Sequence, residues 1–212
     1  MQLIALNINN LTDARYFAAR GVEYLAFQFP NNLEEAPAVF KKIETILEWV
    51  EGVQILLHCN ENNMRLITSE NIPFNFDGFI VPLASHWHKN SLDTEKKVFI
   101  EISFNRCRTI ETFNKTLAAT IHNFPILLLW KDSQIAFNTI CAEILSNNQW
   151  HQAFENTNRE VYIQIPALSE NTLALLKYFN FKGIVISAGE ETIIGEKNYD
   201  TEDALLDALE NM

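Results

Sequence analysis

The sequence predicts a (β/α)8 TIM barrel, an α/β fold in which eight parallel strands close into a cylinder. Two observations lead to this fold class. Short apolar segments rich in β-branched and aromatic residues alternate with helical segments about eight times, and the chain of 212 residues has the length of one compact barrel. No low-complexity tract or linker divides the chain, so we expect a single domain, 1–212. An open doubly wound sheet is the alternative, and the number of units favours the barrel.

Eight segments are predicted to be strands because they are short, apolar and bounded by turn residues. The sixth is almost wholly apolar, which is typical of a parallel strand buried on both faces. The predicted strands are 3–6, 22–29, 53–58, 76–83, 97–102, 124–130, 161–165 and 181–186.

Helices are predicted between the strands from apolar residues at helical spacing and from end signals. Asn10 or Thr12 caps the first helix, Gly21 ends it, and Ser169 begins the one before the last strand. The segment 85–95 shows little helical periodicity, so the fourth unit is the weakest. The other predicted helices are 35–51, 64–69, 109–121, 135–154, 169–179 and 201–209.

Composition argues against several classes of function. The net charge is −11, whereas a nucleic-acid partner requires a basic face. No apolar run reaches the ~20 residues that cross a bilayer, and the amino terminus lacks a signal-peptide pattern, so no membrane partner is predicted. Cys59, Cys107 and Cys141 lie far apart without metal or disulfide spacing, which predicts no metal and a cytoplasmic location. No cofactor is predicted, and monomer and homodimer both stay open.

Function in a TIM barrel lies at the carboxyl ends of the strands. The turn after the last predicted strand, Ser187, Ala188 and Gly189, has backbone amides that could cradle an anion, although a simple strand-to-helix turn is the alternative. Lys197 is interpreted as a solvated charge rather than a phosphate ligand. The predicted ligand-mouth residues are Asn7, Gln28, His58, Lys131 and Gln164.

Two stretches resemble the phosphoribosylanthranilate isomerase family. Residues 6–14 (LNINNLTDA) are similar to the family's Lys-Ile-Cys-Gly segment and the Asn-Leu-x-Asp-Ala that follows it. Residues 187–197 (SAGEETIIGEK) are similar to its Ser-Ser-Gly and Gly-x-Lys segments. The resemblance implies a TIM barrel, an Amadori isomerisation in tryptophan biosynthesis, and a small phosphorylated ligand bound at Ser187, Ala188 and Gly189.

The departures from the family pattern bear on catalysis. The resemblance puts the family's catalytic cysteine at Leu6 and its catalytic aspartate at Leu129, and leucine can neither donate nor accept a proton. The sequence therefore predicts no catalytic residues of the family type, and favours a non-catalytic paralogue. The alternative is an active isomerase, or other sugar-phosphate chemistry, that uses displaced residues such as Glu101 or, more weakly, Asp132.

Overall fold

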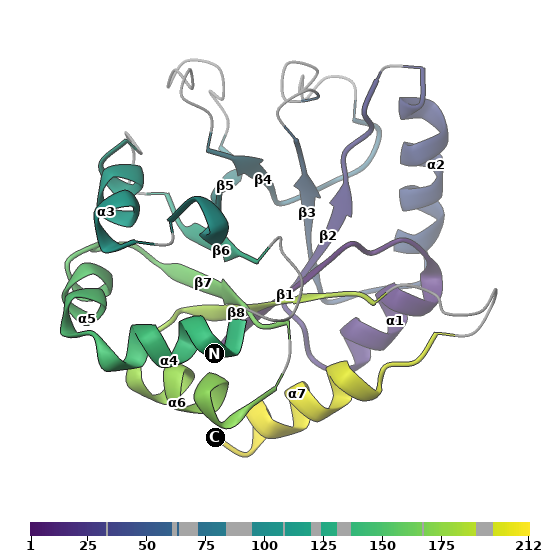
Figure 1. Ribbon diagram of the computed structural model, residues 1–212. Helices are drawn as coiled ribbons and strands as arrows, with labels where there is room; N and C mark the ends of the chain where they lie inside the picture. The colour runs from purple at the N-terminus through teal and green to yellow at the C-terminus, as the bar shows by residue number, and fades with distance from the viewer. Residues whose placement is uncertain are drawn as a thin grey trace.

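The computed structural model shows a closed barrel of eight parallel strands that follow one another in sequence order (Figure 1). The structure describes residues 1–32, 34–60, 63, 72–83, 95–107, 109–119, 124–130, 137–166, 168–189 and 197–212. The predicted fold class is confirmed, and the open-sheet alternative is wrong because β1 pairs with β8 from Gln2 to Leu6. The strands are β1 (Gln2–Leu6), β2 (Tyr24–Gln28), β3 (Gln54–His58), β4 (Gly78–Pro82), β5 (Lys97–Ser103), β6 (Ile126–Leu129), β7 (Val161–Gln164) and β8 (Gly183–Ser187).

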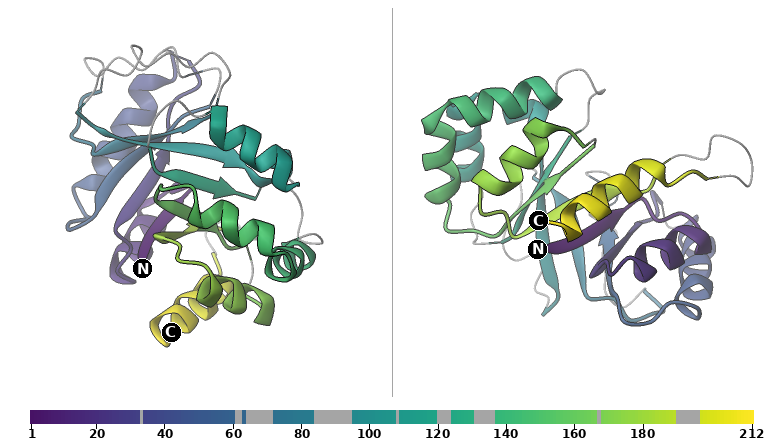
Figure 2. Two further views of the ribbon diagram at one scale, coloured as in Figure 1. Left: turned by 90° about the vertical axis from the view of Figure 1, so that its left-hand side faces the viewer. Right: turned by 90° about the horizontal axis from the view of Figure 1, so that it is seen from below.

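The described helices follow β1, β2 and β5 to β8 and lie outside the barrel (Figures 1 and 2). They are α1 (Leu11–Ala19), α2 (Ala36–Leu47), α3 (Ile110–Ala119), α4 (Phe137–Ser146), α5 (Asn148–Glu155), α6 (Glu170–Tyr178) and α7 (Asp200–Glu210), with a 3-10 turn, η4 (Phe104–Cys107), after β5. Within the described ranges, no helix has the length and apolar character needed to span a membrane. The predicted helix 64–69 and most of the segment 85–95 lie outside the described residues.

Cap residues explain where the helices begin. The Asn10 side chain, not that of Thr12, accepts the backbone N–H of Asp13 at the start of α1, at 2.8 Å. Ser169 caps α6 as predicted. The segment 135–154, predicted to be mostly helical, contains two helices within its described residues: Asn147 leaves the helical conformation and its side chain accepts the N–H of Gln149, at 2.9 Å. A short polar side chain that can cap a helix also offers the backbone an alternative to continuing one.

The apolar side chains form two separate cores. One lies between the strands and the surrounding helices, and the other fills the inside of the barrel. Strand residues alternate between the two faces, so each second residue of a strand points inward. The interior cluster is buried and apolar apart from two tyrosine hydroxyls: Ile4, Leu6, Tyr24, Ala26, Leu56, Ile80, Phe99, Leu127, Leu129, Tyr162 and Val185.

The last helix lies beside the first, and both pictures agree on this arrangement (Figures 1 and 2). The Tyr16 hydroxyl of α1 donates to Asp203 of α7 at 2.6 Å, and Arg20 forms ion pairs with Asp203 and Asp207. Closure of the barrel thus brings the segments that follow β8 next to those that follow β1.

Candidate ligand site at the carboxyl end of the barrel

Two leucines lie at the inner carboxyl end of the barrel. Leu6 ends β1 and Leu129 ends β6, and both belong to the interior cluster, with exposed fractions of 2% and 3%. A fully buried leucine contributes roughly 1.5–3 kcal/mol through removal of its surface from water. These two positions therefore form an apolar floor under the mouth, and neither can transfer a proton.

Polar residues share this end of the barrel with the two leucines. Five of them lie two residues beyond an interior-cluster member on the same strand and therefore face inward: Gln28, His58, Glu101, Gln164 and Ser187. Three of the predicted mouth residues, Gln28, His58 and Gln164, are among them. Lys131 and Asp132 lie outside the described residues.

His58 and Glu101 are in direct contact, and they are the ionisable side chains among these five residues. The His58 Nε2 atom lies 2.5 Å from a Glu101 carboxylate oxygen. Their side chains are 14% and 4% exposed, so the pair is largely shielded from water. The His58 Nδ1 atom is buried and has no hydrogen-bond partner within the described part of the chain. The sequence singled out each residue separately, and the structure brings them together.

A second polar group lies across β7 and β8. The Gln164 side-chain amide donates to the Ser187 hydroxyl at 2.8 Å, and its carbonyl oxygen accepts the backbone N–H of Trp130 at 2.6 Å. Gln164 therefore fixes the orientation of Ser187 and ties the end of β6 to β7. Both side chains are partly exposed.

The amides of the turn after β8 have partners inside the chain. The Ala188 N–H donates to the carbonyl of Leu6 at 2.9 Å. The Gly189 N–H donates to the Glu202 carboxylate at 3.0 Å, and Glu202 is 8% exposed. A carboxylate of α7 thus accepts the Gly189 N–H, one of the amides that the sequence predicts as part of an anion cradle.

Lys197 is not the solvated charge that the sequence suggested. Its ammonium group lies 2.6 Å from Asp13, and the two side chains are 7% and 0% exposed. Asp13 also accepts the Tyr199 hydroxyl at 2.7 Å and the Asn9 N–H at 3.3 Å. The charge of Lys197 is therefore used within the fold, where a buried carboxylate requires a partner.

Asn7 lies in the loop that follows β1 and is exposed. Its backbone φ of 59° falls in the left-handed region, where asparagine is enriched among residues other than glycine. The resemblance aligned Asn7 with a glycine of the isomerase family, and both residue types suit this conformation. The backbone conformation thus accounts for an asparagine at this position, and a contact between Asn7 and a ligand stays a prediction.

The three cysteines are free and buried. Cys59 lies in the outer core while the adjacent His58 faces the barrel interior, so the two cannot act as a Cys/His pair. Burial raises the pKa of the Cys59 thiol above its usual range, and raises the pKa of Cys141 to about 12. Both are therefore protonated at neutral pH and unreactive. Within the described residues, no group of three histidine, cysteine or carboxylate side chains could hold a metal ion.

Comparisons with known proteins give the fold a precedent. A comparison with protein-family models found no matching family, and a comparison with curated proteins found no matching sequence. Among solved structures, phosphoribosylanthranilate isomerase from Thermotoga maritima is similar over 100% of both chains, with 15% identity and a TM-score of 0.70. The isomerase from Thermus thermophilus is similar over 100% of this chain and 99% of its own, with 17% identity and a TM-score of 0.66.

A third similar structure is a phosphoribosylanthranilate isomerase in complex with reduced 1-(o-carboxyphenylamino)-1-deoxyribulose 5-phosphate. It has 15% identity and a TM-score of 0.68, and the similarity covers 100% of both chains. At these identities the likeness concerns the fold. The resemblance stated from the sequence is confirmed at that level: the chain is a divergent TIM barrel that follows the phosphoribosylanthranilate isomerase structures over its whole length.

Proposed function

We propose that this chain is a phosphoribosylanthranilate isomerase-like barrel that does not catalyse that isomerisation. The observation that carries the proposal is the apolar floor. The resemblance aligns the isomerase base and acid with Leu6 and Leu129, and both leucines are packed into the barrel interior. A general acid and base must exchange protons with the substrate, so two leucines at these positions remove that route.

A small phosphorylated ligand at Ser187, Ala188 and Gly189 stays a prediction. It is supported by the resemblance in this turn and by a similar isomerase solved with a deoxyribulose 5-phosphate compound. In this chain a phosphate group at Gly189 competes with the Glu202 carboxylate for the same N–H. A cytoplasmic location likewise stays a prediction, supported by three cysteines that form no disulfide.

Genetic complementation tests the loss of isomerase activity. We expect that this chain, expressed in a tryptophan auxotroph that lacks the isomerase, will not restore growth without tryptophan, because Leu6 and Leu129 cannot transfer protons. The Thermotoga maritima isomerase, expressed in the same strain, is the positive control. Growth restored by this chain contradicts the proposal, and growth that disappears with Glu101→Gln assigns the activity to the displaced residue.

Anion binding at the turn is expected to depend on Glu202. Glu202→Ala frees the Gly189 N–H and removes a negative charge beside it, so inorganic phosphate should bind at least about tenfold more tightly than to the wild type. Thermal shift over a phosphate titration measures this, since a ligand at a hundredfold excess over its dissociation constant adds about 2.7 kcal/mol of stability.

The matched control is Asp200→Ala, which removes an exposed charge from the same first turn of α7 without touching Gly189. Equal phosphate affinity in the two variants would mean that net charge, and not the Gly189 amide, governs binding. Unchanged affinity in Glu202→Ala would remove the case for an anion site at this turn.

A further inference from the structure

The pair of His58 and Glu101 stands at the functional end of the barrel. His58 is the last residue of β3, and Glu101 is the fifth of the seven residues of β5. Each follows an interior-cluster residue, Leu56 and Phe99, by two positions, so both side chains point into the barrel from strands separated by β4. In TIM barrels the groups that act on ligands come from the carboxyl ends of several strands.

Stability alone is a poor reason for such a pair. A buried carboxylate and imidazole lose hydration that their attraction repays only with good geometry, and an apolar pair of similar size is often as stable or more so. The orphaned His58 Nδ1 adds to this cost, because a buried polar atom without a hydrogen bond costs about 1–3 kcal/mol. The interior residues that end β1 and β6 are leucines instead, Leu6 and Leu129. The polar choice at β3 and β5 therefore calls for a reason other than packing.

We propose that His58 and Glu101 form a general-base pair that accepts a proton from a small carbonyl compound bound in the barrel mouth. Glu101 accepts the Nε2–H of His58, which fixes the tautomer whose Nδ1 carries the lone pair. The same carboxylate stabilises the imidazolium that forms when Nδ1 takes a proton. His58 is thus the base and Glu101 is a positioning residue.

The chemistry of the site points to proton transfer at a carbon next to a carbonyl group. Among the described residues, no hydroxyl or thiol contacts the Nδ1 atom of His58, so we assign this atom to proton transfer with the bound compound rather than to activation of a protein nucleophile. The C–H bond beside the carbonyl breaks, the proton moves to Nδ1, and the electron pair passes into the carbonyl to give an enolate. The imidazolium then returns a proton to carbon, so no oxidant or second reactant is consumed. Gln164 and Ser187 provide partners for hydroxyl and carbonyl oxygens of the compound.

Proton transfer by His58 is a different activity from the isomerisation, and the two can be tested independently. A chain that restores the tryptophan auxotroph would overturn the proposed function and leave the base pair standing. A chain that moves no proton would overturn the base pair and extend the loss of activity to this chemistry.

The test measures exchange of carbon-bound protons in D2O by proton NMR, with dihydroxyacetone and dihydroxyacetone phosphate as the two probes. We expect the full-length protein to accelerate exchange of at least one probe, and His58→Gln to slow it by about 100-fold or more. Glu101→Gln should lower the rate, because the carboxylate that orients the imidazole ring is gone, and Glu101→Asp should recover part of the rate.

The matched control is His151→Gln. His151 and Glu155 form another histidine–carboxylate contact, at 3.1 Å, on α5 outside the barrel, so the exchange rate should not change. Thermal melting of each variant checks that it is folded, and Glu101→Gln supplies a second, independent variant if His58→Gln is unstable. Wild-type protein that exchanges neither probe faster than His58→Gln overturns the proposal, as does a rate unchanged by Glu101→Gln. A higher rate with the phosphorylated probe would show that the mouth also favours phosphate.

Discussion

Replacing Lys197 with methionine should lower the free energy of unfolding by about 3–5 kcal/mol. The methionine fills a similar space but leaves the Asp13 carboxylate buried without a cation. The Tyr199 hydroxyl and the Asn9 N–H remain as hydrogen-bond donors and offset only part of the loss. For a chain of this size the midpoint of thermal unfolding should fall by roughly 6–20 °C, measured by circular dichroism.

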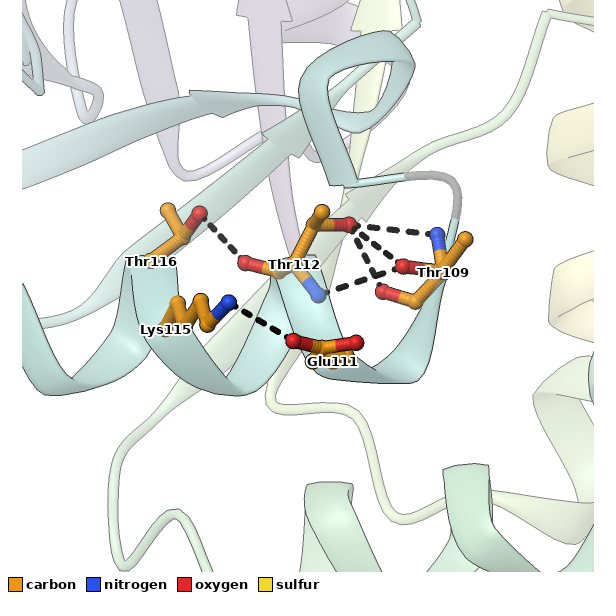
Figure 3. Close-up of polar contacts among 5 residues, drawn as sticks. All are labelled: Thr109, Glu111, Thr112, Lys115 and Thr116. Carbon is orange, nitrogen blue, oxygen red and sulfur yellow. Dashed lines mark hydrogen bonds and ion pairs between the residues drawn. The ribbon is translucent and has the colours of Figure 1, made fainter.

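A second lysine–carboxylate pair has the same nitrogen–oxygen distance but is exposed to solvent, so it serves as the control. Lys115 and Glu111 on α3 also lie 2.6 Å apart, but their side chains are 73% and 74% exposed (Figure 3). Lys115→Met should therefore change stability by less than about 0.5 kcal/mol. The double variant Asp13→Asn with Lys197→Met should lose less than the sum of the two single changes, because neither charge is then left alone. If the two lysine variants lose equal stability, burial is not what makes the Lys197 contact strong.

The fold could be predicted because its signals are local and repeated. Each strand is a short apolar run, and errors of one or two residues at its ends do not alter the order of the elements. The segment 135–154 could not be divided in the same way. Its apolar spacing is compatible with one helix, and only the capping geometry of Asn147 shows that α4 ends and α5 begins there.

The polar pair could not be read from either residue alone. His58 and Glu101 are 43 residues apart in the sequence, and each has an ordinary explanation by itself. The signal that joins them is positional: both follow an inward residue by two places, on strands separated only by β4. Lys197 and Asp13 are 184 residues apart, and they meet because β8 pairs with β1.

An aspartate at position 129, which aligns with the isomerase acid, should destabilise the folded protein. We expect Leu129→Asp to lower the free energy of unfolding by about 4 kcal/mol or more, because it removes a leucine from the interior cluster and buries a carboxylate there. Urea unfolding measures the change, and Leu129→Asn, which is nearly the same shape and uncharged, isolates the contribution of the charge.

The pH dependence of the free energy of unfolding shows whether the carboxyl group introduced by Leu129→Asp is buried in apolar surroundings. Apolar surroundings raise the pKa of the new carboxyl group in the folded state above its value of about 3.9 in the unfolded chain. The free energy of unfolding of Leu129→Asp should therefore fall furthest below that of Leu129→Asn at high pH, and the difference should be smallest below about pH 4. The reason is that the carboxyl group ionises at a lower pH in the unfolded chain than in the folded one. A deficit independent of pH would mean that water or a cation already reaches this position. A loss of stability that grows with pH would mean that the apolar surroundings of Leu129 oppose a carboxylate at the position of the isomerase acid. Proton transfer in this barrel would then have to come from other residues, such as His58 and Glu101.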